Sequence, residues 1–239
     1  YEITYGDWSS DVCSSDLGAN ERNAVAANHA HGIEISHELT TVGNRVVGNY
    51  VGTRPDGRGG NAGTGNWNFG IHLEDHSNHS VVEQNVVAYN RRGGITLQRT
   101  TTDNIVRDNI VGVNAAGQLV GNGDGGWGIR LADGAADNTI GPGNDIRGNL
   151  RGIEMAHTTT LRNRVTRNAI SQNLALGIDL PPLGGANPND PGDADNGTQT
   201  LLNWPALTAA TPDRVTALTC PGCTVELFVA DRKSTRLNS

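Results

Sequence analysis

The chain has 239 residues, a formal net charge of −7, 32 glycines and only 4% aromatic residues. An acidic balance argues against a nucleic-acid partner, because phosphate backbones attract basic surfaces. No run of 18 apolar residues occurs, so the sequence predicts no membrane-spanning helix.

Both ends of the chain are interpreted as artefacts. Residues 1–17 and 231–239 match the translation of short-read sequencing adapters. Such non-native segments are excluded from the prediction of the fold. The genuine sequence is then expected at 18–230, as a fragment cut at both ends. It would carry a net charge of −5 and retain Cys220 and Cys223 as its only cysteines.

A tetrapeptide Gly-Ile-x-Leu, with Ile or Met also allowed at its end, occurs six times. The isoleucines are 38, 24, 34, 24 and 25 residues apart, which indicates a solenoid with a unit of about 24 residues. The six copies begin at Gly32, Gly70, Gly94, Gly128, Gly152 and Gly177.

Each unit also contains asparagines five or six residues apart, as in Asn44 and Asn49 or Asn104 and Asn109. Asn and Gly suit corners, because they tolerate left-handed backbone and satisfy turn amides. The Ile-x-Leu alternation indicates a strand with one inward face. Each unit is therefore predicted to form three short strands separated by corners. The asparagines of successive units should stack in hydrogen-bonded ladders.

No segment shows ten or more residues of helical periodicity, so the predicted fold class is all-β. We expect a right-handed, single-stranded parallel β-helix of about six rungs over residues 18–180. One interior column should contain Ile33, Ile71, Ile95, Ile129, Ile153 and Ile178. A second column should stack beside it, formed by Ile35, Leu73, Leu97, Leu131, Met155 and Leu180.

This repeat, over about residues 20–180, resembles secreted bacterial proteins with right-handed parallel β-helix repeats and a pectate-lyase-like architecture. The resemblance implies a secreted or cell-surface location. It implies no single activity, because such proteins include lyases, hydrolases, epimerases, adhesins and uncharacterised surface proteins, and fold does not transfer function.

Two long units carry glycine-rich insertions at equivalent positions, residues 48–65 and 111–126. Each insertion ends just before a tryptophan, Trp67 in the first and Trp127 in the second. Insertions in repeats form loops on one face, often the binding face. Both tryptophans are therefore candidate sugar-stacking platforms. The alternative is that each ring covers the base of its own loop.

Residues 181–205 are rich in Pro, Gly and Asp and are interpreted as a linker or cap. Asp190, Asp193 and Asp195 offer closely spaced hard oxygens of the kind that Ca²⁺ prefers. They are therefore candidate calcium ligands, with a solvated turn as the alternative. No other cofactor is predicted.

Residues 206–230 contain short strand-like runs and are predicted to begin a truncated β-sandwich-like module. Cys220 and Cys223 lie within this segment. In the exported setting that the resemblance implies, they would form a disulfide across a turn or half of a zinc site.

The outward positions of the repeat strands form one column of mostly ionisable residues: Glu34, His72, Thr96, Arg130, Glu154 and Asp179. A lyase or epimerase needs a base and a cation that stabilises an enolate, roles that His72 and Arg130 could take. A hydrolase needs two carboxylates, which Glu34 with Glu74 or Glu154 with Asp179 could supply.

The alternative is a solvated polar face, on which opposite charges of neighbouring strands stabilise their pairing. We therefore favour a structural and binding module with polysaccharide as its partner. His72, Arg130 and Glu154 stay as catalytic candidates, and Trp67, Trp127, Glu34 and Glu74 as substrate-binding candidates. A polysaccharide lyase, hydrolase or epimerase and a mechanical stalk are the competing hypotheses.

Overall fold

A computed structural model describes most of the chain as a rod with a short C-terminal extension. The described residues are 22–36, 42–60, 63–123, 126–192, 196–201, 203–211, 213–219 and 224–226. The two segments interpreted as adapter lie outside this part of the chain, as do Cys220 and Cys223. No helix within the described residues is long and apolar enough to cross a membrane.

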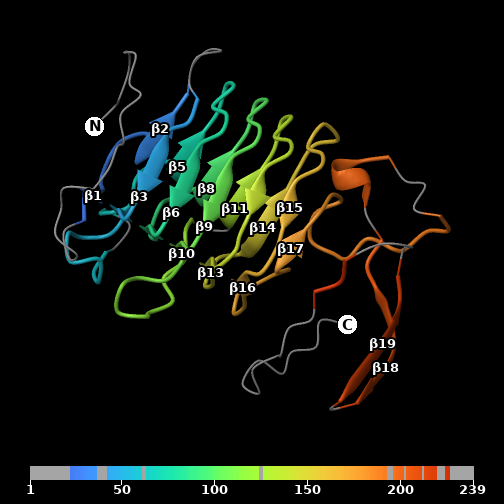
Figure 1. The fold of residues 1–239 in the computed structure, drawn as a ribbon. Helices are drawn as coiled ribbons and strands as arrows, with labels where there is room; N and C mark the ends of the chain where they lie inside the picture. Colours follow the sequence, from blue (N-terminus) through green and yellow to red (C-terminus); the bar gives the residue numbers. More distant parts are fainter. Residues whose placement is uncertain are drawn as a thin grey trace.

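Three parallel sheets run along the rod (Figure 1). Sheet 1 holds the Gly-Ile-x-Leu strands β2 (Ile33–Ile35), β5 (Phe69–Leu73), β8 (Gly93–Leu97), β11 (Trp127–Leu131), β14 (Arg151–Met155) and β17 (Ile178–Asp179). Sheet 2 holds β3 (Arg45–Val47), β6 (Val81–Glu83), β9 (Ile105–Arg107), β12 (Thr139–Ile140) and β15 (Arg164–Val165). Sheet 3 holds β1 (Ala24–Val25), β4 (Tyr50–Val51), β7 (Val86–Val87), β10 (Ile110–Val111), β13 (Asp145–Ile146) and β16 (Ala169–Ile170).

Each turn of the chain adds one strand to each sheet, which confirms the predicted parallel β-helix. The isoleucine column is in register from Ile33 through to Ile178. Its central members are fully buried, whereas Ile178 is 46% exposed because it lies in the last strand of sheet 1. Leu180 follows that strand and packs against the core while only half-buried.

The glycine of the repeat is required by a close approach between rungs. A Cβ atom on Gly94 would lie 2.4 Å from the carbonyl oxygen of Gly128 and 2.7 Å from Cγ1 of Val111. A Cβ atom on Gly152 would similarly lie 2.5 Å from the carbonyl oxygen of Gly177. These contacts are shorter than any side chain tolerates, so the corner closes only around glycine.

Asparagine ladders join the rungs at the corners, as predicted. The first consists of Asn23, Asn49, Asn85, Asn109, Asn144 and Asn168. The second consists of Asn28, Asn66, Asn90, Asn122, Asn149 and Asn173. The third joins Asn104, Asn138, Asn163 and Gln199. Inner members such as Asn85, Asn109 and Asn122 also bond to backbone carbonyl groups, so the ladders fix the register of the rungs.

The chain leaves the rod after β17. A short 3₁₀ segment, η1 (Thr198–Leu201), rests on the last corner, where Gln199 extends the third ladder. The following strands β18 (Ala206–Thr211) and β19 (Arg214–Leu218) form an antiparallel hairpin with mostly exposed side chains. The described part of the predicted second module thus forms β structure, and its domain boundaries remain a prediction.

Replacing a central ladder residue should destabilise the rod more than replacing a terminal one. Asn85 donates to Asn109 and to the carbonyl of Val46, and it accepts a bond from the backbone of Asn49. We expect Asn85→Ala to lower the free energy of unfolding by about 2–3 kcal/mol, because several buried groups lose partners. Urea denaturation measures this difference.

Asn173→Ala is the matched control, because Asn173 ends the second ladder and is only half-buried. Its expected loss is below about 1 kcal/mol, since water can replace the missing amide. Equal losses for the two variants would contradict a cooperative role for the ladder.

Candidate functional site

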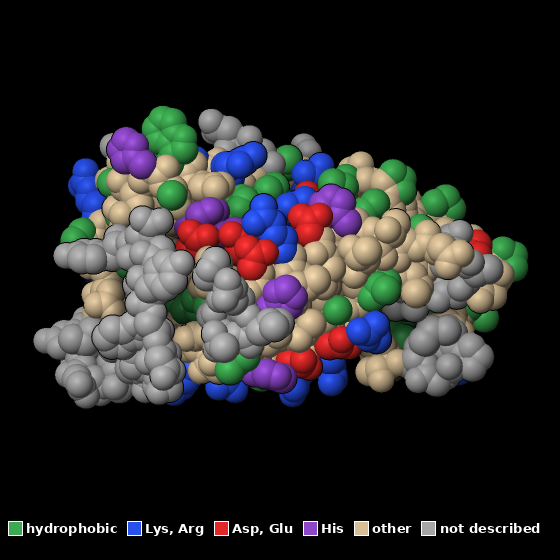
Figure 2. Space-filling model, turned by 90° about the horizontal axis from the view of Figure 1, so that it is seen from above, with side chains coloured by type: hydrophobic (Ala, Val, Ile, Leu, Met, Phe, Trp, Pro, Cys, Tyr) green, Lys and Arg blue, Asp and Glu red, His purple; other side chains and the backbone are tan. Residues whose placement is uncertain are grey.

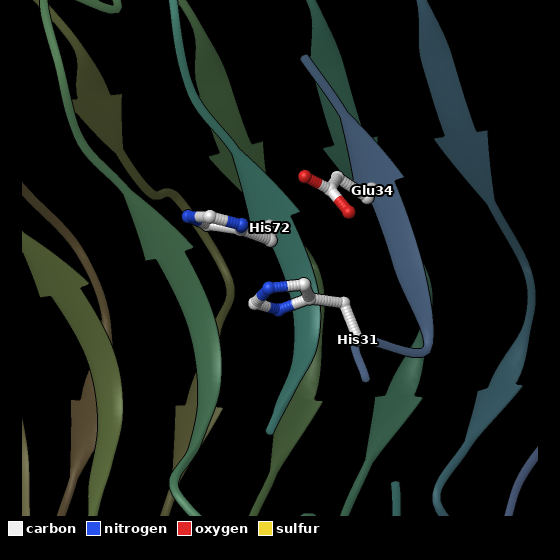
Figure 3. A group of neighbouring side chains, drawn as sticks. All are labelled: His31, Glu34 and His72. Atoms are coloured by element: carbon white, nitrogen blue, oxygen red, sulfur yellow. The ribbon is translucent and has the colours of Figure 1, made fainter. Parts of the chain in front are cut away.

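Three potential metal ligands converge at the N-terminal end of sheet 1. Glu34 in β2 and His72 in β5 are register partners on adjacent parallel strands, so their side chains leave the same face. His31 precedes β2 and lies over the same face, with its ring centroid 4.3 Å from that of His72. Figure 3 shows the three side chains pointing toward a common region.

The donor atoms of His31, Glu34 and His72 all lie within 4.8 Å of one another. Two imidazoles and one carboxylate form a donor set that suits divalent first-row metals such as copper, zinc and nickel. In the described part of the chain, this is the one cluster of three such side chains within metal-binding distance.

His72 is the most unusual member of this cluster. Its side chain is 2% exposed, and neither ring nitrogen has a hydrogen-bond partner. Burial lowers the pKa of His72 to about 3, and the nearby His31 and Arg99 charges add to this effect. Nε2 lies 3.6 Å from Oε2 of Glu74, within ion-pair range, but a ring kept neutral by burial forms no ion pair. At neutral pH the ring therefore offers an unprotonated nitrogen.

His31 is held in place by a neighbouring amide. Its Nε2 lies 3.1 Å from the side-chain amide of Asn68, whereas Nδ1 is buried and has no partner. The pKa of His31 is lowered, and burial is the largest cause. The charge of Glu74 opposes this shift, and the charge of Arg92 adds to it. When Nε2 carries the ring proton and donates it to the Asn68 amide, Nδ1 is unprotonated and is the nitrogen available to a metal ion.

The two rings lie in a cleft of about 490 Å³. Figure 2 shows histidine, acidic and basic side chains gathered in a strip on one face of the rod. Glu74, a substrate-binding candidate, lines this cleft, and its carboxylate is held by Arg99 at 2.8 Å and by Gln98 at 3.1 Å. The remaining walls include Phe69, Arg92, Trp127 and Arg130.

The expectation of a solvated outward face is wrong. His72, Thr96, Glu154 and Asp179 are all buried. The cause is a cover of large side chains from a second outward column, which includes Phe69 and Trp127. The outward face of sheet 1 is therefore a packed layer of its own.

A chain of ion pairs occupies the C-terminal half of this layer. Arg130 contacts Glu154 at 2.8 Å, and Arg151 contacts both Glu154 at 3.2 Å and Asp179 at 2.6 Å. One guanidinium thus bridges the two carboxylates considered as a hydrolytic pair. Both are charge partners in a buried network, and among the described residues their ion pairs are with Arg130 and Arg151 and not with the histidine cluster.

The two tryptophans occupy different environments. Trp127 lies across Gly93, and its Nε1 donates to Oγ1 of Thr96 at 3.1 Å. Trp67 is 54% exposed and stacks against the guanidinium of Arg91 at 3.7 Å. Trp127 therefore covers the sheet, as the alternative interpretation has it, whereas Trp67 borders an adjacent groove of about 850 Å³.

The calcium candidates lie far along the chain from this cluster. Asp190 is tied to Asn203, which donates to its backbone oxygen at 2.8 Å and to its carboxylate at 3.3 Å. Asp193 and Asp195 lie outside the described residues. The calcium site therefore stays a prediction.

Sequence reasoning missed His31, Phe69 and Arg92 as parts of the cleft. The first two occupy the position immediately before a repeat glycine, as does Trp127. Because glycine and isoleucine both point inward at the corner, the preceding side chain faces outward. Reading that position as a second outward column would have found them. Arg92 lies one residue earlier in its unit and had no comparable signal.

The chain also matches the model of a known protein family. The family model described as periplasmic copper-binding protein (NosD) matches residues 9–182, which is more than half of the chain. The matched range begins inside the segment interpreted as adapter, so that interpretation also stays a prediction. No curated protein and no solved structure matches the chain.

The buried ring of His72 should make stability depend on pH. Its pKa falls from 6.5 to about 3 on folding, so between these values the unfolded state binds a proton that the folded state does not. The free energy of unfolding should therefore decrease as the pH falls below 6.5, by up to about 1.4 kcal/mol per pH unit. Urea denaturation in the presence of a chelator, at pH 7, 6 and 5, measures this slope.

His72→Thr provides the comparison, because threonine occupies the same position in the next rung as Thr96. The variant should lose stability less steeply than the wild type as the pH falls. Identical pH slopes for both proteins would show that the imidazole does not resist protonation.

Proposed function

The chain belongs to the NosD family of periplasmic copper-binding proteins, and on this premise we propose that it binds a copper ion at His31, Glu34 and His72. It would act as an extracytoplasmic β-helix module, in agreement with the secreted location implied by its repeats. The observation that carries the proposal is the buried His72 ring, whose two nitrogens lack partners beside a carboxylate and a second imidazole.

The donor set fits a metal on energetic grounds. A buried polar atom without a partner costs about 1–3 kcal/mol, and Nδ1 of His31 and both nitrogens of His72 are in this state. A metal ion would give one nitrogen of each ring a partner. It also requires unprotonated imidazole, which is the form that burial favours for His72.

The chemistry of the donors favours divalent copper. Cuprous ions prefer sulfur ligands, but Met155, the one methionine, packs in the hydrophobic core. No sulfur atom lines the cleft among the described residues. Imidazole and carboxylate ligands bind Cu²⁺ more tightly than Zn²⁺ in the general order of divalent metals. Bound copper would supply a Lewis-acidic centre with positions left for a further ligand.

Copper binding should depend on the ring of His72. We expect the wild type to bind one Cu²⁺ per chain by isothermal titration calorimetry, and more tightly than Zn²⁺. His72→Thr and Glu34→Gln should each weaken binding by about 100-fold or more, since even residues that only support metal ligands contribute 10–100-fold. A parallel Ca²⁺ titration should be unaffected by either variant.

His157→Ala is the matched control. His157 is an exposed imidazole that contacts the carboxylate of Asp133 at 2.7 Å, so it imitates an adventitious surface site. Copper binding should survive this substitution. Loss of binding in His157→Ala, with retention in His72→Thr, would place the ion elsewhere.

A second candidate function is polysaccharide binding in the groove beside the cleft. Trp67 presents a half-exposed ring there, close to Tyr89, Arg91 and Arg92. An exposed indole combines a flat apolar face with a polar edge, which suits contact with a sugar ring. The lyase hypothesis keeps one structural argument, because His72, Arg130 and Glu74 line the same cleft.

Trp67→Ala and Trp127→Ala should therefore have different effects. With a panel of uronate polymers and neutral glycans, Trp67→Ala should weaken glycan binding by about tenfold, since burying the apolar surface of a large side chain contributes about 1.5 kcal/mol or more. Trp127→Ala should instead lower the unfolding free energy, because its ring covers sheet 1.

The same panel separates the binding module from a lyase. Binding without unsaturated products supports a module, whereas product formation that is lost in His72→Thr supports catalysis. Absence of glycan binding in the wild type would remove this second candidate and leave the copper proposal intact.

A further inference from the structure

We infer that the cleft holds a small carboxylate ligand together with the metal ion, anchored by Arg92 at the cleft wall. This inference rests on the proposed copper site and goes beyond it, because it names a second ligand and the residue that selects it. Its basis is the distribution of charge around the cluster of His31, Glu34 and His72.

Two of the three guanidinium groups that line the cleft already have carboxylate partners. Arg99 contacts Glu74 at 2.8 Å and Asp75 at 3.6 Å. Arg130 contacts Glu154 at 2.8 Å. The other acidic residue of the lining, Asp133, contacts His157 at 2.7 Å. The guanidinium groups of Arg99 and Arg130 are therefore already engaged by carboxylates of the protein.

Arg92 differs from both of them. Its side chain is exposed, and its guanidinium lies 6.0 Å from the ring centroid of Phe69. In the described part of the chain, no carboxylate lies within ion-pair distance of Arg92. Arg92 lines the same cleft as His31 and His72 and therefore contributes an uncompensated positive charge there.

A divalent cation beside an uncompensated guanidinium is electrostatically unfavourable. Glu34 supplies one negative charge among the three proposed ligands, so the loaded cleft would retain a net positive charge. An anion that contacts both the metal and Arg92 removes this conflict. A carboxylate suits this role, because a guanidinium binds its two oxygens through parallel N–H groups, and imidazole-rich copper sites accept oxygen ligands.

Two sources could provide this carboxylate. One is a small free acid that enters the cleft from solvent. The other is the acid group of a uronic sugar in the adjacent groove, because Arg92 and Asn68 line both spaces. Both sources present the same chemistry to Arg92, but only the sugar would contact Trp67 as well.

The experiment measures copper affinity of the full chain with and without acetate in a non-coordinating buffer. Acetate also binds copper in solution, and it does so to the same extent for every variant. The ratio of the two dissociation constants is therefore compared between variants. We expect acetate to raise the relative affinity of the wild type by about tenfold, within the usual range of coupling between two sites. The electron paramagnetic resonance spectrum of the bound copper should shift at the same time.

Arg92→Gln should abolish both the acetate effect and the spectral shift, and Arg92→Lys should retain part of them. Arg164→Gln is the matched control, since it removes one exposed positive charge outside the cleft. It should behave like the wild type. A uronic acid disaccharide in place of acetate identifies the source, since only its effect should decrease in Trp67→Ala.

The outcomes separate the two proposals. If copper does not bind under either condition, the proposed function fails and the inference fails with it. If copper binds but acetate changes neither the affinity nor the spectrum, the inference is overturned and the proposed function stands. An acetate effect that persists in Arg92→Gln also overturns it, because another residue would then anchor the anion.

Discussion

The close contact of successive rungs at the repeat glycine determines the rest of this structure. Backbone carbonyl groups approach the glycine Cα so closely that no side chain fits, and the chain can therefore turn sharply between sheets 3 and 1. Glycine and isoleucine then both point inward. The asparagine ladders beside this corner lock each rung to the next one. Every outward side chain of sheet 1 consequently has a fixed neighbour one rung away.

This fixed register gives the outward face two different chemical regions. In the C-terminal half, acidic and basic residues of neighbouring rungs neutralise one another, as Arg130 and Glu154 do. At the N-terminal end, two imidazoles meet, and Nδ1 of His31 and both nitrogens of His72 have no hydrogen-bond partner. The first arrangement stabilises the folded state without a ligand. The second leaves buried donor atoms that a bound ion could satisfy, and the rigid rod would hold them in place before binding.

Most of the fold could be predicted from the sequence because a solenoid repeats its contacts at short range. Aligning the copies of Gly-Ile-x-Leu already places Ile71 beside Ile95, since equal positions in successive units become neighbours in space. The same reasoning placed Glu34 beside His72. It could not predict that most of this column is buried. Burial depends on how the rings of Phe69 and Trp127, from a different column, lie across the strands. That packing is a property of side-chain size and direction, which the repeat does not encode.

The same geometry explains why His31, the residue that sequence reasoning missed, matters most for a metal site. Equivalent positions on adjacent parallel strands are about 4.8 Å apart, whereas two donors bound to one ion lie at most about 4 Å apart because each metal–nitrogen bond is about 2 Å long. A column of parallel side chains therefore presents a row of donors and does not by itself make them converge. Convergence needs a ligand that approaches from another direction. His31 supplies it, because it leaves the chain at the corner before β2 and crosses over the ring of His72. A β-helix can thus present ionisable columns along its whole length, but it gathers three donors within 4.8 Å of one another where a corner residue lies over the column.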